Sequence, residues 1–178
     1  ALFIRTFAFQ AFRIPTGSME DTLLVGDFLF VNKFLYGAEI PFTGGTRLPG
    51  IRSPERGDII VFRFPKDPSP DYIKRCVAVP GDTIEYKDKV LYVNGEQQGE
   101  AFVKHADGDR ISPGRDNFGP REIPEGKYFM MGDNRDRSSD SRYWGLLDEK
   151  LIRGKALFIY WSWDGQWVRF SRIFDIIR

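Results

Sequence analysis

Short apolar runs separated by turn-forming residues recur along the chain, a pattern typical of β-strands. The runs extend over Phe28–Asn32, Asp58–Phe64, Tyr72–Val79, Thr83–Tyr86 and Val90–Val93. Gly, Pro, Asn or Asp lie at or near the ends of these runs, which are too short for typical helices. We therefore expect a mostly β fold with few short helices.

Two dipeptides indicate tight hairpin turns. Asn94–Gly95 follows the fifth run, and Asp164–Gly165 lies between two aromatic-rich segments near the end of the chain. Both pairs suit two-residue turns with positive φ. Beyond the second turn, Ser171 is expected to begin a short terminal helix, because serine is a favoured N-cap.

A polar, Gly- and Pro-rich stretch interrupts the strand pattern over residues 104–126 and predicts irregular structure. It lies within a segment that we expect to be a small inserted β domain, residues 83–126. The main β core is then expected to comprise residues 1–82 and 127–178, with residues 1–12 as its N-terminal segment.

The two ends of the chain are rich in apolar residues. Residues 1–12 include nine apolar residues but also Arg5, and they are fewer than the ~20 needed to span a bilayer. They fit either a buried N-terminal strand or the exit of a membrane helix into a strand. Trp161, Trp163 and Trp167 favour core packing, with a belt at a membrane interface as the alternative.

Composition excludes several classes of site. Lys and Arg total 26 against 25 Asp and Glu, so the chain has no strongly basic surface for nucleic acid. One Cys excludes an internal disulfide, and one His excludes a multi-histidine metal site. Asp133, Asn134, Asp136 and Asp140 do not match a calcium loop, whose sixth and twelfth positions here hold Ser138 and Trp144. We expect no metal and no cofactor.

A serine and a lysine are the remaining candidates for nucleophilic catalysis. Ser18 lies in a Pro- and Gly-containing turn before an apolar run, although an ordinary capped turn would look the same. Lys74 lies inside an apolar strand, flanked on its own face by Tyr72 and Cys76. A lysine with its normal pKa is only about a thousandth neutral at pH 7.5, but burial lowers that pKa. A snorkelling surface lysine is the alternative.

The string GDNRDRSSDSRYWG, residues 132–145, is a polar turn between apolar runs. A solvated turn is the simple interpretation. A hydroxyl such as Ser138 could instead orient a neutral lysine amine, and an Asp140–Arg142 pair could brace the loop.

Together these strings resemble the bacterial type I signal peptidase family. The similarity covers nearly the whole chain, in the family's order: FRIPTGSMEDTLLVGDFLFVNKFLYG, RGDIIVFRFP, DYIKRCVAVPGD and GDNRDRSSDSRYWG. The resemblance implies a β-rich catalytic core with a small inserted β domain. It also implies a membrane-associated serine endopeptidase that removes signal peptides from exported preproteins.

The resemblance assigns roles residue by residue. Ser18 matches the nucleophile and Lys74 the general base, and Thr16 with the Ser18 amide matches the oxyanion hole. Ser138 matches the residue that hydrogen-bonds the lysine, with Asp140 and Arg142 as the supporting pair. The implied pockets for small side chains at −1 and −3 are lined by Phe12, Ile14, Met19, Leu23, Val61, Tyr72 and Ile73.

Three positions depart from the family pattern. Asp21 stands where many members have Pro, Cys76 replaces a residue that is often small and apolar, and Arg137 stands where a smaller polar residue is common. We expect Asp21 to change the rigidity of its turn without removing a catalytic group.

The resemblance also implies a location in the cell. It implies the bacterial inner membrane, with the catalytic domain on the extracytoplasmic face, and we expect this chain to lack its transmembrane anchor. Expected partners are preprotein signal peptides and the lipid surface, and the sequence does not indicate an oligomeric state. The alternatives are a hydrolase using His105, a self-cleaving repressor and a catalytically silent β module that binds membrane surfaces.

Overall fold

The computed structural model describes residues 9–40, 43 and 46–178. The strands are β1 (Phe9–Arg13), β2 (Asp27–Asn32), β3 (Ile59–Arg63), β4 (Asp71–Ala78), β5 (Thr83–Lys87), β6 (Val90–Val93), β7 (Glu96–Gln97), β8 (Phe118–Glu122), β9 (Lys127–Met131), β10 (Leu147–Asp148) and β11 (Ile152–Ser162). The helices are η1 (Gly17–Met19), η2 (Arg135–Arg137), α2 (Ser141–Trp144), η3 (Glu149–Leu151) and η4 (Phe170–Arg172). The mostly β class predicted from the sequence is confirmed.

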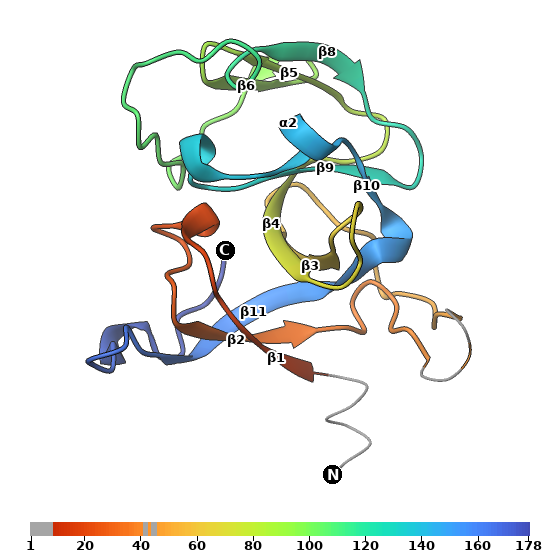
Figure 1. Ribbon diagram of the computed structural model, residues 1–178. Helices are drawn as coiled ribbons and strands as arrows, with labels where there is room; N and C mark the ends of the chain where they lie inside the picture. Colours follow the sequence, from red (N-terminus) through yellow and green to blue (C-terminus); the bar gives the residue numbers. More distant parts are fainter. Residues whose placement is uncertain (1–8, 41–42, 44–45) are drawn as a thin grey trace.

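The strands form two antiparallel sheets. The larger has the order β1-β2-β11-β3-β4-β9-β10, and the smaller has the order β7-β6-β5-β8. In Figure 1 the smaller sheet lies beyond β9 at one end, and β1, β2 and β11 lie at the opposite end. The central strands β3 and β4 therefore separate the small sheet from the N- and C-terminal strands.

One segment predicted to be irregular contains a strand. Phe118–Glu122 forms β8 and pairs with β5, with the register shifting between Ile84 and Tyr86. Gly119 has a φ of 87°, and its Cβ position would lie 2.6 Å from the Ile84 carbonyl oxygen. The glycine permits this close approach. A residue type that usually interrupts strands therefore allows β8 to pair with β5.

The two predicted hairpins differ in length. Asn94 and Gly95 have φ values of 55° and 80°, and Val93 pairs with Glu96, so they form the predicted two-residue turn. At the second site Trp163 pairs with Val168, which leaves four residues in the loop. The Asp164 carboxylate accepts hydrogen bonds from the amides of Gln166 and Trp167 and closes this longer turn.

The predicted terminal helix is wrong. Only η4, a single 3-10 turn, forms there, and Ser171 lies inside it instead of capping it. Phe174 has a φ of 68°, which a helix does not allow. The segment instead returns to β11, where the Phe174 amide bonds to the Ile159 carbonyl and the Ile177 amide to the Leu157 carbonyl.

The small sheet shares its core with the large one. Ile84, Tyr86 and Leu91 of the small sheet pack with Phe129 and Met131 of β9 in one buried cluster. The strands of the small sheet all fall within the segment predicted as an insert, but the shared cluster joins it to the rest. The division into domains stays a prediction.

The aromatic side chains near the C-terminus are exposed, so core packing was the wrong interpretation. Trp161, Trp163 and Trp167 are 40%, 43% and 75% exposed. At the other end, β1 is an edge strand in which Ala11 is exposed and Phe12 half-buried, so this part of residues 1–12 is not a buried strand. Residues 1–8 lie outside the described residues. Among the described residues, no helix is long and apolar enough to cross a membrane.

Candidate active site

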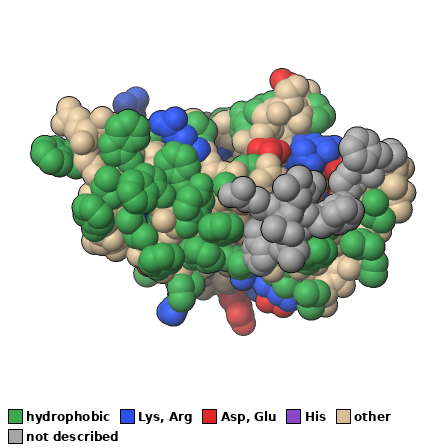
Figure 2. Space-filling view, turned by 90° about the horizontal axis from the view of Figure 1, so that it is seen from below, with side chains coloured by type: hydrophobic (Ala, Val, Ile, Leu, Met, Phe, Trp, Pro, Cys, Tyr) green, Lys and Arg blue, Asp and Glu red, His purple; other side chains and the backbone are tan. Residues whose placement is uncertain are grey.

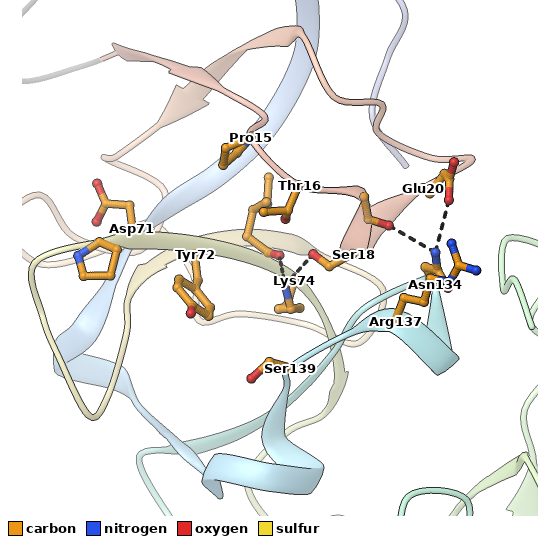
Figure 3. Close-up of a pocket in the computed structure, with 13 residues that line it drawn as sticks. Pro15, Thr16, Ser18, Glu20, Asp71, Tyr72, Lys74, Asn134, Arg137 and Ser139 are labelled. Carbon is orange, nitrogen blue, oxygen red and sulfur yellow. Dashed lines mark hydrogen bonds between the residues drawn. The ribbon is translucent and has the colours of Figure 1, made fainter. Parts of the chain in front are cut away.

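Ser18 and Lys74, which are 56 positions apart in the chain, meet in the folded protein. The Lys74 Nζ donates to the Ser18 Oγ at 2.7 Å and to the Ile73 carbonyl oxygen at 3.0 Å. Figure 3 shows the two groups facing each other, and both residues are buried. A hydroxyl and an amine at this distance have the geometry of a nucleophile and its base.

Local structure fixes both groups. Ser18 lies in η1, the single turn after β1, and Thr16 is the extended N-cap residue before that turn. Lys74 lies in β4, where Ile60 of β3 is its partner. The nucleophile is thus carried by a turn and the amine by a strand in the centre of the large sheet. Thr16 is exposed and borders the same cavity as both groups.

Burial changes the proton affinity of Lys74. Desolvation lowers its pKa from 10.5 to about 8, although the nearby charges of Asp140 and Asp133 act in the opposite direction. With a pKa of about 8, about a quarter of the amine is neutral at pH 7.5, against a thousandth for an exposed lysine. The snorkelling interpretation of Lys74 therefore does not fit the structure.

Ser138 is close to the site but is not bonded to the lysine. Its side chain is buried, and its Oγ has no hydrogen-bond partner among the described residues. It packs against Gly132, where an added Cβ would meet the Ser138 side chain and lie 2.5 Å from the Ser18 carbonyl oxygen. Gly132 therefore lets two site segments approach closely, a role that the sequence pattern did not predict.

Asp140 and Arg142 form the pair that the sequence predicted. The Arg142 Nε and Nη2 each donate to one carboxylate oxygen of Asp140 at 2.8 Å, and both side chains are fully buried. Asp140 also accepts from the Gly132 amide at 3.1 Å, and Arg142 donates to the Arg135 carbonyl at 2.6 Å. The pair therefore connects the residue after β9 with η2 and α2.

Asn134 connects the two turns of the site. Its backbone amide donates to the Ser18 carbonyl at 3.1 Å, and its Nδ2 donates at 3.2 Å to both the Gly17 carbonyl and the Glu20 carboxylate (Figure 3). Both Nδ2 partners are acceptors, which defines the orientation of the side-chain amide. Asn134 therefore holds η1, the turn that carries the nucleophile. The sequence pattern did not indicate a role for Asn134 in the site, because this contact depends on the fold.

A second buried ion pair lies next to Lys74. Arg75 donates to both carboxylate oxygens of Asp133, at 2.8 and 2.7 Å, and Asp133 also accepts from the Thr22 hydroxyl at 2.6 Å. The remaining Arg75 nitrogen donates to the carbonyls of Gly57 and Arg178. β4 is thereby tied to the polar turn and to the end of the chain. The partners are too distant in sequence for a local pattern to reveal them.

A cavity of about 510 Å³ opens over the Ser18–Lys74 pair. It is lined by Pro15, Thr16, Gly17, Ser18, Glu20, Pro70, Asp71, Tyr72, Ile73, Lys74, Asn134, Arg137 and Ser139. Of the predicted substrate-binding residues, Tyr72 and Ile73 line it.

The other predicted substrate-binding residues lie elsewhere. Ile14, Met19 and Leu23 are buried in one core cluster, against which Ile73 packs. Val61 is buried in β3 opposite Ile73, and Phe12 lies in the edge strand β1. These five residues therefore support or flank the cavity rather than line it.

His105 is not part of this arrangement. It lines a different cavity with Asp88 and Lys89, and its Nδ1 lies 3.8 Å from Asp136. Burial lowers the pKa of His105. The structure therefore gives the hydroxyl of Ser18 a lysine partner and not a histidine.

Comparisons with known proteins indicate the family of this chain. The family described as "Signal peptidase, peptidase S26" matches residues 1–161. A signal peptidase I of Pseudomonas aeruginosa is 42% identical over 194 residues, covering 91% of this chain and 68% of the relative. One of Aquifex aeolicus is 37% identical over 215 residues, covering 90% and 79%.

A solved structure is also similar. The crystal structure of a signal peptidase I from Enterococcus faecalis matches with a TM-score of 0.50 and 34% sequence identity, covering 60% of this chain and 98% of that one. The resemblance inferred from the motifs is thereby confirmed. The chain belongs to the signal peptidase family, peptidase S26.

Proposed function

We propose that this protein is a serine endopeptidase that removes signal peptides from exported preproteins, with Ser18 as nucleophile and Lys74 as general base. The observation that carries the proposal is the 2.7 Å contact between the Lys74 amine and the Ser18 hydroxyl inside a buried site. Family membership supports the class of substrate.

The reaction follows acyl transfer chemistry. Neutral Lys74 takes the proton of Ser18 as the Oγ attacks the scissile carbonyl carbon and forms a tetrahedral intermediate. The protonated lysine then gives its proton to the departing amine, which leaves an ester between Ser18 and the signal peptide. Lys74, neutral again, takes a proton from water as the water attacks that ester. The protonated lysine then returns this proton to the Ser18 Oγ as the signal peptide leaves as a carboxylic acid.

Thr16 and the Ser18 amide are the proposed oxyanion donors. Both residues border the cavity, and the Thr16 side chain makes no capping bond to η1. It is therefore free to donate to the oxygen that becomes negative in the intermediate. Loss of one such donor typically lowers kcat by about 10² to 10³.

The substrate is proposed to bind as an added strand. Among the named strands, β9 pairs with β4 only at Arg75, Cys76 and Ala78, so this edge of β4 is unpaired at Asp71–Ile73. The same three residues line the cavity. An extended peptide can lie along this edge. The apolar walls beside it, Pro15, Tyr72 and Ile73, are the proposed contacts of small side chains at −1 and −3.

The proposed setting is a membrane surface, on the extracytoplasmic face of the bacterial inner membrane. Hydrophobic side chains gather over part of the face seen from below in Figure 2, at the end of the molecule that holds β1, β2 and β11. Large apolar side chains exposed near the C-terminus are Trp161, Trp163, Trp167, Phe170, Phe174 and Ile176. Indole rings suit the boundary between lipid and water.

Cleavage of a preprotein tests the function. The full chain, Ser18→Ala and Lys74→Ala are incubated with a preprotein in detergent, and the products are measured by mass. We expect one cut after a small residue with the unmodified chain and a loss of at least about 10³-fold in rate for each variant. Ser69→Ala and Lys66→Ala, exposed residues between β3 and β4, are the matched controls and should cleave normally.

Other results would contradict the proposal. A preprotein left intact by the unmodified chain would favour the silent membrane-surface module. Cleavage that survives in Lys74→Ala but is lost in His105→Ala would assign the base to the histidine.

A further inference from the structure

The charged side chains that line the cavity differ in whether they have an ion-pair or hydrogen-bond partner. Four charged side chains line it: Glu20, Asp71, Lys74 and Arg137. Glu20 lies 3.5 Å from Lys104, and Asp71 lies 3.5 Å from Arg153. Lys74 is bonded to Ser18 and Ile73. Only the Arg137 guanidinium has no ion pair or hydrogen bond among the described residues.

Arg137 is also placed to meet a bound peptide. It belongs to η2, is exposed, and its backbone amide donates to the Asn134 carbonyl. Figure 3 shows Glu20, Asn134 and Arg137 at one end of the cavity and Asp71, Tyr72 and Pro15 at the other, with Ser18 and Lys74 between them. The guanidinium therefore lies at the polar end of the cavity.

The two ends of the cavity suit different parts of a substrate. The end with the apolar side chains of Tyr72 and Ile73, on the open edge of β4, suits the small side chains that precede the cut, and the Asp71 carboxylate at this end is paired with Arg153. The polar end is then left for the residues that follow the cut. A guanidinium without a partner attracts a carboxylate, with which it forms charge-assisted hydrogen bonds.

We propose that Arg137 is a specificity-determining residue that selects substrates with an acidic side chain in the first residues after the cleavage site. The inference rests on the proposed function, because it assigns the polar end of the cavity to the mature part of a preprotein. An exposed ion pair gives a modest preference, roughly two- to fivefold in kcat/KM, and salt weakens it.

Matched preproteins test the proposal. Three substrates are identical except at the first two positions after the cut, which hold Glu, Gln or Lys. With the unmodified chain we expect kcat/KM for Glu to exceed that for Gln roughly two- to fivefold, and that for Lys to be lowest. The preference should disappear in Arg137→Gln and should reverse in favour of Lys in Arg137→Glu.

A control separates Arg137 from net charge. Arg121→Gln removes an exposed positive charge from β8, outside the cavity, and should keep the full preference. Equal rates for Glu and Gln with the unmodified chain, or an unchanged ratio in Arg137→Gln, would overturn the proposal while cleavage continues. Failure of the proposed function would look different, since no substrate would then be cut in a Ser18-dependent way.

Discussion

At the scale of single residues, Lys74 shows how burial makes a base. Its side chain is buried, with Tyr72 and Cys76 on either side of it on the same face of β4, and desolvation outweighs the two nearby carboxylates that favour the charged form. A lysine at the same place on an exposed strand would stay protonated at neutral pH. The reactivity that we propose therefore comes from the position of the residue and not from its type alone.

The dependence of rate on pH tests this directly. Because the base must be neutral, kcat/KM should fall about tenfold per pH unit below the pKa of Lys74, which is about 8. Rates on a peptide substrate from about pH 6 to about pH 10 check the position of this limb. An apparent pKa near 10.4 for the fall in rate would contradict the conclusion that burial lowers the pKa of Lys74. Lys74→Arg should be inactive at every pH, because guanidinium keeps its proton.

Burial of Lys74 also affects stability. The unfolded lysine holds its proton up to about pH 10.4, whereas the folded one releases it near pH 8, so folding is penalised at neutral pH by up to about 3 kcal/mol. Between these two values the unfolded chain binds more protons, so the penalty shrinks as the pH rises. Relative to Lys74→Met, the unmodified chain should therefore gain stability from about pH 8 to pH 10.4.

Denaturant unfolding of both proteins across this pH range provides the measurement. Packing differences between lysine and methionine add a constant, so the slope of the difference with pH is the informative quantity. Lys66→Met, at an exposed position, should give a flat difference. A flat difference for Lys74→Met as well would mean that the amine is not desolvated.

At the scale of elements, the turn after Ser18 contains a residue with positive φ. Asp21 has a φ of 79°, a left-handed conformation that asparagine and aspartate tolerate better than most residues. Proline, which the resemblance to the family led us to expect there, cannot adopt it because its ring holds φ near −65°. This turn is closed by a bond from the Leu23 amide to the Met19 carbonyl at 2.7 Å.

A proline at position 21 should therefore lower both the stability and the activity of this protein. We expect Asp21→Pro to lower stability by roughly 1–3 kcal/mol and to lower kcat/KM, because the turn that carries Ser18 must rearrange. Asp21→Gly keeps the conformation accessible and also removes the side chain that contacts Lys104, so it is the matched control. Urea denaturation and preprotein cleavage measure both effects. Equal stability of the two variants would show that the left-handed conformation is not required.

Elements with a local signal were predictable, and those that depend on distant contacts were not. Alternation and turn residues located β2 to β6, but β8 was missed because Gly119 and Pro120 read as strand breakers. The terminal helix was predicted because nothing local reveals that residues 174–177 return to β11. Ser18 and Lys74 were chosen by residue type and context, whereas Gly132 and Asn134 matter through contacts with η1 that only the fold creates.

At the scale of the whole molecule, the exposed aromatic end is connected to the active site. Arg172 of η4 donates to the Thr22 carbonyl at 2.9 Å and pairs with the buried Asp27. The Trp163 amide donates to the Gly26 carbonyl at 3.1 Å. These bonds hold the C-terminal segment against the chain that follows Ser18. If the exposed aromatic residues bind a lipid surface, these bonds therefore also determine where the cavity lies relative to that surface.

Membrane binding tests this arrangement. Trp167 and Phe174 are each 75% exposed, and burying a large apolar side chain in lipid contributes roughly 1.5–3 kcal/mol. We expect the chain to sediment with lipid vesicles and its tryptophan emission to shift to the blue. Replacing Trp167 and Phe174 with Ser should lower the partition coefficient at least about tenfold.

The control for this experiment is an exposed apolar residue elsewhere. Ile51 is 77% exposed and lies in the loop between β2 and β3, so Ile51→Ser should partition as the unmodified chain does. Cleavage of a soluble peptide should be unchanged in the double variant, whereas cleavage of a vesicle-bound preprotein should fall with the partition coefficient. If the double variant and the unmodified chain bind vesicles equally, the aromatic residues do not hold the enzyme at the membrane. The contacts of the C-terminal segment with Thr22 and Asp27 then serve folding alone.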